Sequence, residues 1–419
     1  MMKHSIIKIL ILSCSALFLT TTMAFSDPIA LTDAYVATLS DDAILKSNAY
    51  DEGNYWLILW QIFADIFLLW VLMKFSLSQK LRDWVKRKTQ KSWLQTIIYT
   101  PFYLILSFLI LLPWSFYTGF WREKAYALSN HTSLSWLTEQ MTGLLVSLVA
   151  FTLLVTAIYG IIKKAPNSWW AWSTVVTTAA LMFMLFIGPV IISPLFNDYV
   201  AMEEGPLKER IISMAQANGV PVDNIYMVNA SKQSTRISAN VQGLGSTARI
   251  SLNDNLLNNN SDAEIAAVMG HEIGHYALGH SQEMLVNFSL LIGLGFAFVN
   301  WGYGFVSRGI GKKWQLNGIS DIAGLPLILA LFSFYFFITT PVFNSVIRSN
   351  ETEADIFGLN AAAEPEGFAT IALKLSTYRK ISPGLWEERI FHDHPSGYNR
   401  VLMSMRWKLA MEKMHQSKN

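Results

Sequence analysis

The residues best suited to chemistry in this chain of 419 residues form the motif His271-Glu272-Ile273-Gly274-His275. Residues four positions apart share one face of a helix, so both imidazoles can bind a single metal ion. Glu272 lies beside them and can accept a proton from a water molecule at that ion. Zinc suits this site because it accepts nitrogen ligands, keeps an open position and lowers the pKa of its water to about 7. The motif therefore predicts a zinc site with His271 and His275 as ligands and Glu272 as general base.

A catalytic zinc ion normally needs a third protein ligand, and this chain has to supply it from a carboxylate. The single cysteine, Cys14, lies in the N-terminal apolar segment, which excludes a cysteine-based zinc site and an internal disulfide framework. His280 is five residues after His275, which is not the spacing of a third ligand. We expect His280 to point elsewhere, either into solvent or onto the back of a ligand.

The acidic cluster Glu351-Thr352-Glu353-Ala354-Asp355 is the best source of the third ligand. On a helix, Glu351 and Asp355 share a face, while Glu353 points about 200° away. Only one of Glu351 and Glu353 can then be the ligand, and the pairing with Asp355 favours Glu351. Asp355 would orient a ligand imidazole from behind. The alternative is a solvated acidic helix face that binds no metal.

The composition is that of a membrane protein. Hydrophobic residues make up 52% of the chain and charged residues only 15%, and the mean hydropathy is +0.32. A soluble protein carries about 25% charged residues, so an ordinary cytosolic globule is excluded. The 32 basic and 30 acidic side chains leave a net charge of +2, so we expect no nucleic-acid partner.

Six apolar runs are long enough to cross a bilayer, which takes about 20 residues. Trp and Tyr stand at their ends, as expected at a membrane–water interface. They contain little charge beyond Asp65, which we expect to face the interior or a neighbouring helix. A seventh run, Ile6–Phe25, is either a removed signal peptide or a retained first membrane helix. The six predicted spans are Trp56–Met73, Trp93–Tyr117, Met141–Ile162, Trp169–Ile192, Met284–Phe305 and Ala323–Val346.

The positive charges of the short loops lie mainly on one side of the membrane. Segment 74–92 is rich in Lys and Arg, whereas the opposite loops 26–54 and 118–140 contain few basic residues. The positive-inside rule then puts the N-terminus in the cytoplasm and the polar segments 193–283 and 347–419 outside. Further basic residues on the predicted cytoplasmic side are Lys3, Lys8, Lys163, Lys164, Arg308, Lys312 and Lys313.

The polar segments are expected to form a small α+β domain beside the membrane helices. The pattern predicts helices at Gly205–Gly219, Ser261–Leu278, Val346–Ala362 and Pro365–Tyr378, and strands at Asn224–Val228, Thr235–Val241 and Arg249–Leu252. The chain then divides into 1–25 (signal peptide or first helix), 26–192 (four spans), 193–283 (peptidase domain with the His271 motif), 284–346 (two spans) and 347–419 (third ligand).

At this point the sequence resembles the type I CAAX prenyl proteases, which are membrane zinc metallopeptidases of the endoplasmic reticulum with bacterial relatives. The resemblance covers nearly the whole chain, and its compact loops are typical of a bacterial member. The most specific match combines the His271 motif with the E-x-x-A-D sequence Glu351–Asp355. Further matches are Trp121-Arg122-Glu123, Tyr126 to Thr132, Ser238-Ala239-Asn240, His394-Pro395 and Arg400.

The resemblance implies a mainly α fold, in which seven membrane helices enclose a chamber and the zinc site faces into it. It implies one zinc ion on His271, His275 and Glu351, with Glu272 as base and His394 over the scissile bond. Substrate would contact Asn240, Gly243 and Arg400. The eukaryotic members of the family place the zinc domain in the cytosol, whereas the loop charges of this chain favour the periplasmic side of a bacterial inner membrane.

We therefore expect a zinc-dependent membrane endopeptidase that acts on a peptide or protein substrate, lipidated or membrane-associated. The substrate would lie extended beside the edge strand Asn240–Gly243, where Gly243 either leaves room for it or forms a turn. One alternative is an intramembrane protease, which the polar run Asn253 to Glu264 before the motif argues against. The other is a membrane transporter or scaffold that binds zinc without cleaving anything.

Overall fold

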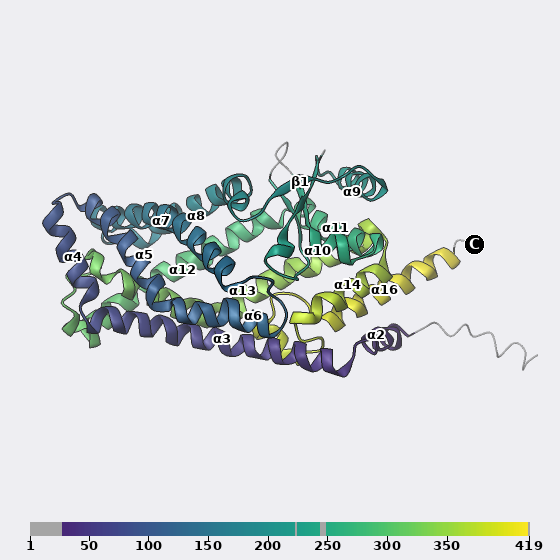
Figure 1. The fold of residues 1–419 in the computed structure, drawn as a ribbon, viewed down its shortest axis with the longest axis horizontal. Coiled ribbons are helices and arrows are strands. Elements are labelled where there is room, and N and C mark those ends of the chain that lie inside the picture. Colours follow the sequence, from purple (N-terminus) through teal and green to yellow (C-terminus); the bar gives the residue numbers. More distant parts are fainter. Residues whose placement is uncertain (1–26, 223, 244–248, 418–419) are drawn as a thin grey trace, which may run out of the picture.

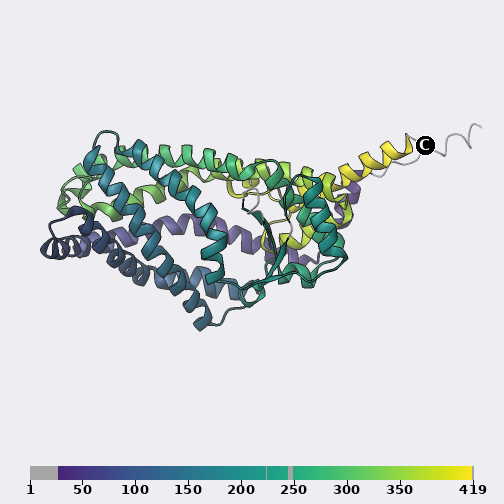
Figure 2. The same cartoon turned by 90° about the horizontal axis from the view of Figure 1, so that it is seen from above.

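The computed structural model describes residues 27–222, 224–243 and 249–417. The seventh apolar run predicted at Ile6–Phe25 lies outside these residues. Figure 1 shows an elongated molecule, in which long helices run along the long axis and a small sheet lies toward one end. Figure 2 shows the same long helices side by side from above.

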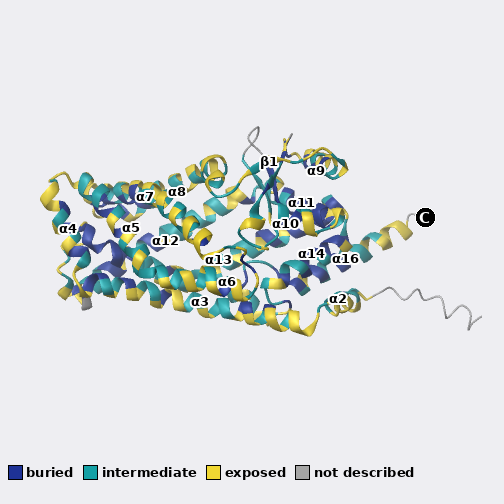
Figure 3. Ribbon diagram, viewed as in Figure 1, coloured by how far each residue is buried: buried dark blue, intermediate teal, exposed yellow. Residues whose placement is uncertain are grey.

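Six helical segments in the described part of the chain are long and apolar enough to cross a membrane, and they confirm the six predicted spans. Two of them continue through a π-helical turn, at Tyr117–Trp121 and at Gly188–Ile192. Many of their residues are exposed, as the yellow and teal segments of Figure 3 show. Many of the exposed residues are large and apolar, and these would contact lipid. The spanning helices are α3 (Asp41–Lys74), α5 (Ser92–Phe116), α7 (Ser133–Lys164), α8 (Trp169–Ile187), α12 (His280–Arg308) and α13 (Leu325–Ala362).

The membrane helices are held together at the end that carries the basic helix α4 (Leu77–Lys88). Leu72, Tyr99, Tyr159 and Trp169 are almost completely buried there, in one apolar cluster. Farther along the spans, Asp65 of α3 accepts a hydrogen bond of 2.5 Å from a serine hydroxyl of α13. The carboxylate therefore contacts a neighbouring helix, one of the two surroundings predicted for it.

A four-stranded sheet forms the core of the polar part. Its order is β1-β2-β4-β3, in which β2 and β4 are parallel and the other two pairs are antiparallel. Within the described residues, β3 therefore pairs with a strand on one side only and lies at an edge of the sheet. Strands β2 to β4 match the three predicted ones, whereas the short β1 was not predicted. The strands are β1 (Tyr199–Ala201), β2 (Ile225–Val228), β3 (Ala239–Gln242) and β4 (Arg249–Asn253).

Helices flank this sheet and carry the rest of the polar part. Helix α11 (Asp262–Ala277) packs its apolar face on the sheet, burying Ile265, Met269 and Ile273 against Ile250. The prediction of a separate helix at Val346–Ala362 is wrong, because this segment continues the last span as one helix, α13. Four of the remaining helices were not predicted, α2, α10, α15 and α16. The remaining helices are α2 (Pro28–Val36), α9 (Pro206–Ala217), α10 (Asp254–Asn259), α14 (Pro365–Leu375), α15 (Leu385–Phe391) and α16 (Gly397–Gln416).

Candidate metal centre and active site

The helix α11, which carries the motif, is fixed at its start by a capping box. The Ser261 hydroxyl accepts a hydrogen bond from the Glu264 N–H, and the Glu264 carboxylate accepts one of 2.8 Å from the Ser261 N–H. Lys374 of α14 forms an ion pair of 2.8 Å with the same carboxylate. The cap satisfies N–H groups that the first turn leaves without partners, and it joins α11 to α14.

Glycines allow α11 and α13 to pack at close range. A Cβ atom at Gly358 would lie 2.7 Å from the backbone nitrogen of His271, and one at Gly270 would lie 2.8 Å from the carbonyl oxygen of Gly358. A Cβ at Gly274 would meet the side chain of Phe357 at 3.1 Å. This close approach brings the acidic cluster of α13 within reach of the two histidines of α11.

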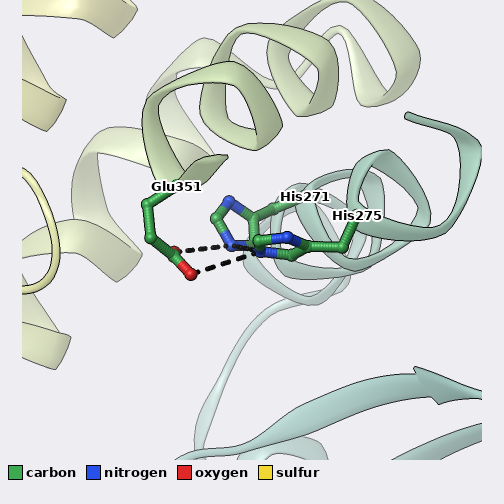
Figure 4. A group of neighbouring side chains, drawn as sticks. All are labelled: His271, His275 and Glu351. Carbon is green, nitrogen blue, oxygen red and sulfur yellow. Dashed lines mark hydrogen bonds and ion pairs between the residues drawn. The ribbon is translucent and has the colours of Figure 1, made fainter. Parts of the chain in front are cut away.

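Three side chains converge where the two helices meet, as Figure 4 shows. The Nε2 atoms of His271 and His275 are 3.0 Å apart. Oε2 of Glu351 lies 3.2 Å from Nε2 of His271, and Oε1 lies 3.4 Å from Nε2 of His275. In the described part of the chain, these residues form the only group of three or more with ligand atoms gathered closely enough to hold a metal ion.

The donor set of this group fits zinc. Two imidazole nitrogens and one carboxylate are the ligands of many catalytic zinc sites, and tetrahedral bonds of about 2.0 Å place such ligand atoms about 3.3 Å apart. The observed separations lie close to this value. In addition, Glu351 is buried, and its Oε2 atom faces the Nε2 atom of His271 at 3.2 Å, where a carboxylate ligand of a shared ion would lie.

His271 is oriented from behind by a buried ion pair. Oδ1 of Asp355 lies 2.8 Å from Nδ1 of His271, and Asp355 is completely buried. Arg400 donates two hydrogen bonds to the same carboxylate, at 2.9 and 2.5 Å. Burial alone would lower the pKa of His271, but its hydrogen bonds with Asp355 and Glu351 outweigh burial and raise the pKa to about 10. A metal ion at Nε2 therefore has to displace a proton.

His275 is oriented by His280. The two Nδ1 atoms are 2.9 Å apart, and Nε2 of His280 lies 3.4 Å from Oε2 of Glu353. His280 is only 1% exposed. The prediction that His280 points into solvent is therefore wrong. The other prediction, that it contacts the back of a candidate ligand, is confirmed by its contact with His275.

Glu272, His271 and Glu351 together line a pocket of about 220 Å³. Burial raises the pKa of Glu272 above its usual range. A raised pKa brings a carboxylate closer to neutral pH, where a general base is most effective. Apolar side chains form much of the rest of the wall, among them Val268, Phe368, Ile371 and Leu375.

His394 lines the same pocket from the loop between α15 and α16. Its Nε2 atom is 3.2 Å from Oε2 of Glu351, and its Nδ1 atom is 2.7 Å from Oδ1 of Asp393. Burial lowers the pKa of His394, so its neutral form, which carries one N–H, is favoured. The same loop contacts helix α3 through His392. Its Nε2 atom lies 2.9 Å from Oδ2 of Asp51 and 2.8 Å from the hydroxyl of Tyr55.

Of the three predicted substrate contacts, only Arg400 lines the active-site pocket. Asn240 is on β3 opposite Ser251 of β4, and its buried Oδ1 accepts no hydrogen bond from the described residues. Gly243 follows β3 with φ of +92° and lines a second cavity, of about 370 Å³, toward α8. Arg400 lines the active-site pocket but is paired with Asp355, so its contact with a substrate stays a prediction.

Sequence reasoning missed the supporting residues that lie far away in the chain. Tyr378 and Arg379 line the pocket, and Asp393 holds the His394 ring. Asp393 had a signal, because it is the acidic neighbour of a candidate catalytic histidine. No sequence signal pointed to Asp51 and Tyr55, since they lie just before the first predicted span and far from the motif.

Comparisons with known proteins place this chain in a family. The model of peptidase family M48 matches residues 201–404, and the model of the CAAX prenyl protease N-terminal domain, described as five membrane helices, matches residues 27–198. In that region the described residues form four helices long enough to span a membrane.

A relative from Bacillus subtilis (strain 168), named uncharacterized metalloprotease YhfN, is 30% identical over 383 residues, which are 89% of each chain. CAAX prenyl protease 1 of Saccharomyces cerevisiae is 29% identical over 59% of this chain and 57% of its own length. The crystal structure of Ste24p from S. mikatae has the same fold, with a TM-score of 0.73 over 91% of this chain and 96% of that one, at 22% identity.

The fold, the membrane helices and the family matches together define a membrane metalloprotease. The chain belongs to peptidase family M48, among the relatives of the CAAX prenyl proteases. This membership confirms the resemblance found in the sequence. It also sets aside the alternative of a transporter or scaffold without activity.

Proposed function

We propose that this protein is a zinc-dependent endopeptidase that hydrolyses peptide bonds at the pocket beside α11. The observation that carries the proposal is the convergence of His271, His275 and Glu351 next to Glu272. His271, His275 and Glu351 would hold one zinc ion. When bound, zinc supplies a Lewis acid that polarises a peptide carbonyl and makes water a better nucleophile near neutral pH.

The protein's own residues would handle the protons. Glu272, whose pKa is raised by burial, would accept the proton of the attacking water and deliver it to the leaving amine. The Nδ1 atom of His394 faces the Asp393 carboxylate and carries the one proton of the neutral ring. Nε2 would therefore donate a hydrogen bond to the carbonyl oxygen, where negative charge develops in the transition state, only in the protonated form of the ring. Asp393 supports this role, because its contact with Nδ1 fixes the orientation of the ring.

The substrate would bind as an additional strand along β3. This strand is at the edge of the sheet, and residues Ser238 and Ala239 at its start line the pocket. An extended peptide can form main-chain hydrogen bonds with such an edge. The amide of Asn240 would bind the substrate backbone through its Oδ1 atom, which accepts no hydrogen bond from the residues that the structure describes.

The substrate class we propose is a peptide or protein, lipidated or associated with the membrane, and the bilayer is the second partner. The names of the prenyl protease relatives motivate the lipidated class. We place the protein in a bacterial inner membrane, with 193–283 and 347–419 as the peptidase part. The motif helix α11 is not among the six candidate spans, so cleavage inside the membrane is the weaker alternative.

The substitution Glu272→Gln tests the proposal directly. It should reduce cleavage of an unfolded protein substrate by at least about 100-fold, because the general base is lost. Zinc content measured by plasma mass spectrometry should stay at about one ion per chain, since Glu272 is not a ligand. The matched control is Glu209→Gln, which changes an exposed carboxylate of α9 and should leave both activity and zinc unchanged. Wild-type activity in the Glu272→Gln variant would refute the assignment.

A further inference from the structure

Behind His275, on the side away from the pocket, lies a pair of side chains that the proposed reaction does not use. His280 contacts the back of the His275 ring, and Glu353 contacts the far side of His280. We propose that His280 is a positioning residue for His275, and that Glu353 supports His280 in this task. The inference rests on the proposed function, because it takes His275 as a zinc ligand.

The position of each proton along this chain follows from the geometry. Nε2 of His275 faces the other two ligands, at 3.0 Å from His271 and 3.4 Å from Glu351, so it has to present a lone pair to the metal. The single proton of the neutral ring is then on Nδ1 and is donated to Nδ1 of His280. His280 in turn carries its proton on Nε2, which faces the carboxylate of Glu353.

The surroundings of His280 restrict it to this role. It begins α12 directly after Gly279, whose φ of +74° lets the chain turn sharply between α11 and α12. The His275 and His280 rings meet edge to face, at 72° and 5.0 Å between centroids. A buried ring held in this way by the turn is a fixed acceptor, and fixed partners of this kind typically improve metal binding by about 10- to 100-fold.

The two ligand histidines are therefore supported by different chemistry. His271 has a buried carboxylate, Asp355, behind it, whereas His275 has a neutral imidazole. Glu353 is a weaker support than His280, because its side chain is 58% exposed and its contact is long. Water competes with such a contact, so we expect loss of Glu353 to matter less than loss of His280.

The test measures the rate at which the purified full-length protein releases zinc into an excess of chelator, followed with a colorimetric zinc indicator. His280→Ala should release zinc about 10- to 100-fold faster than wild type, because His275 loses its acceptor. His280→Asn should stay within about 3-fold of wild type, since its Oδ1 can take the place of Nδ1 as acceptor. Glu353→Ala should lie between wild type and His280→Ala. Ser281→Ala, an exposed neighbour on the same helix, is the control for changes at the start of α12.

Several results would overturn the inference. One is release from His280→Ala at the wild-type rate, and another is equal acceleration in His280→Ala and His280→Asn, which would assign the effect to packing. The cobalt-substituted protein gives a second readout, because its absorption spectrum should shift in His280→Ala and return toward wild type in His280→Asn. Failure of the proposed function is distinguishable, since wild-type protein would then hold no stoichiometric zinc at all.

Discussion

At the scale of single residues, three carboxylates in five positions of α13 have three different partners. Glu351 faces both histidines of the candidate zinc site, Asp355 contacts the back of His271, and Glu353 contacts His280. The helical angle between Glu351 and Glu353 separates their directions, whereas Asp355 returns to nearly the same face one turn later. A single short motif would therefore provide both the proposed third ligand, Glu351, and the contacts behind both histidines.

The different partners of Glu351 and Glu353 lead to a prediction for variants of these two residues. The substitution Glu351→Ala should strip zinc from the protein during purification and abolish hydrolysis, because only two protein ligands remain. Glu353→Ala should still hold about one zinc ion per chain in the absence of chelator, although it releases the ion faster when challenged. Metal analysis of both purified variants checks this, and the reverse result would mean that Glu353 is the ligand.

At the scale of elements, the site depends on the distance between α11 and α13. The contact is set by glycines on both helices. Gly358 is the one glycine of α13, and a Cβ there would press on the backbone of α11. Backbone atoms cannot yield in the way a flexible side chain does. The separation of the two helices, and with it the position of Glu351, is therefore sensitive to a single methyl group.

We expect Gly358→Ala to lower the free energy of unfolding by about 1 to 3 kcal/mol, the usual result of overpacking. Activity and zinc content should fall with it, because α13 has to move away from His271. Thermal unfolding in detergent, with metal analysis, measures both effects. The control is Gly160→Ala in α7, where a new Cβ meets nothing within 4 Å and should leave the melting temperature unchanged or slightly raised. Equal behaviour of the two variants would contradict the packing argument.

The sequence predicted the elements that have a strong local pattern. Apolar length identified the six spans, and Ser261 with Glu264 marked the start of the motif helix. Strand β1 has only three residues, too few for the alternation of apolar and polar side chains that predicts a strand. The apolar run that predicted the last span ends before the last turns of α13, because these turns pack against α11 and not against lipid.

The candidate site was predictable where its residues are close in the chain. The two histidines, and likewise Glu351 and Asp355, are four residues apart, which is the spacing of side chains on one face of a helix. The sequence left two surroundings open for His280, solvent and the back of a ligand. It could not decide between them, because the contact with His275 depends on the turn at Gly279. The partners of His392 on α3 depend on a tertiary contact over more than 300 residues, for which no local pattern exists.

At the scale of the whole molecule, the basic helix α4 and the catalytic part lie toward different ends of the long axis (Figure 1). Helix α3, with 34 residues, is about 51 Å long and exceeds the bilayer core of about 30 Å. Its N-terminal turns therefore project beyond the core to the end where they meet the His394 loop. The loop charges then predict that the catalytic end is on the periplasmic side.

Single cysteines introduced on the Cys14→Ser background test this orientation in intact cells. Glu209→Cys on α9 should react with a membrane-impermeant maleimide once the outer membrane is opened, because α9 belongs to the catalytic end. Arg87→Cys on α4 should react only after the inner membrane is permeabilised. The opposite pattern would place the catalytic part in the cytosol, as in the eukaryotic relatives.

The continuity of α13 has a practical consequence for biochemistry on this enzyme. The same 38-residue helix crosses the membrane and then carries Glu351, and α11 passes into the span α12 through a two-residue turn at Leu278 and Gly279. Cutting the chain at the membrane boundary would therefore divide α13 and would separate α11 from the span that follows it. We therefore expect that a water-soluble catalytic fragment cannot be excised, and that inhibitor screening will need the whole protein in detergent or nanodiscs.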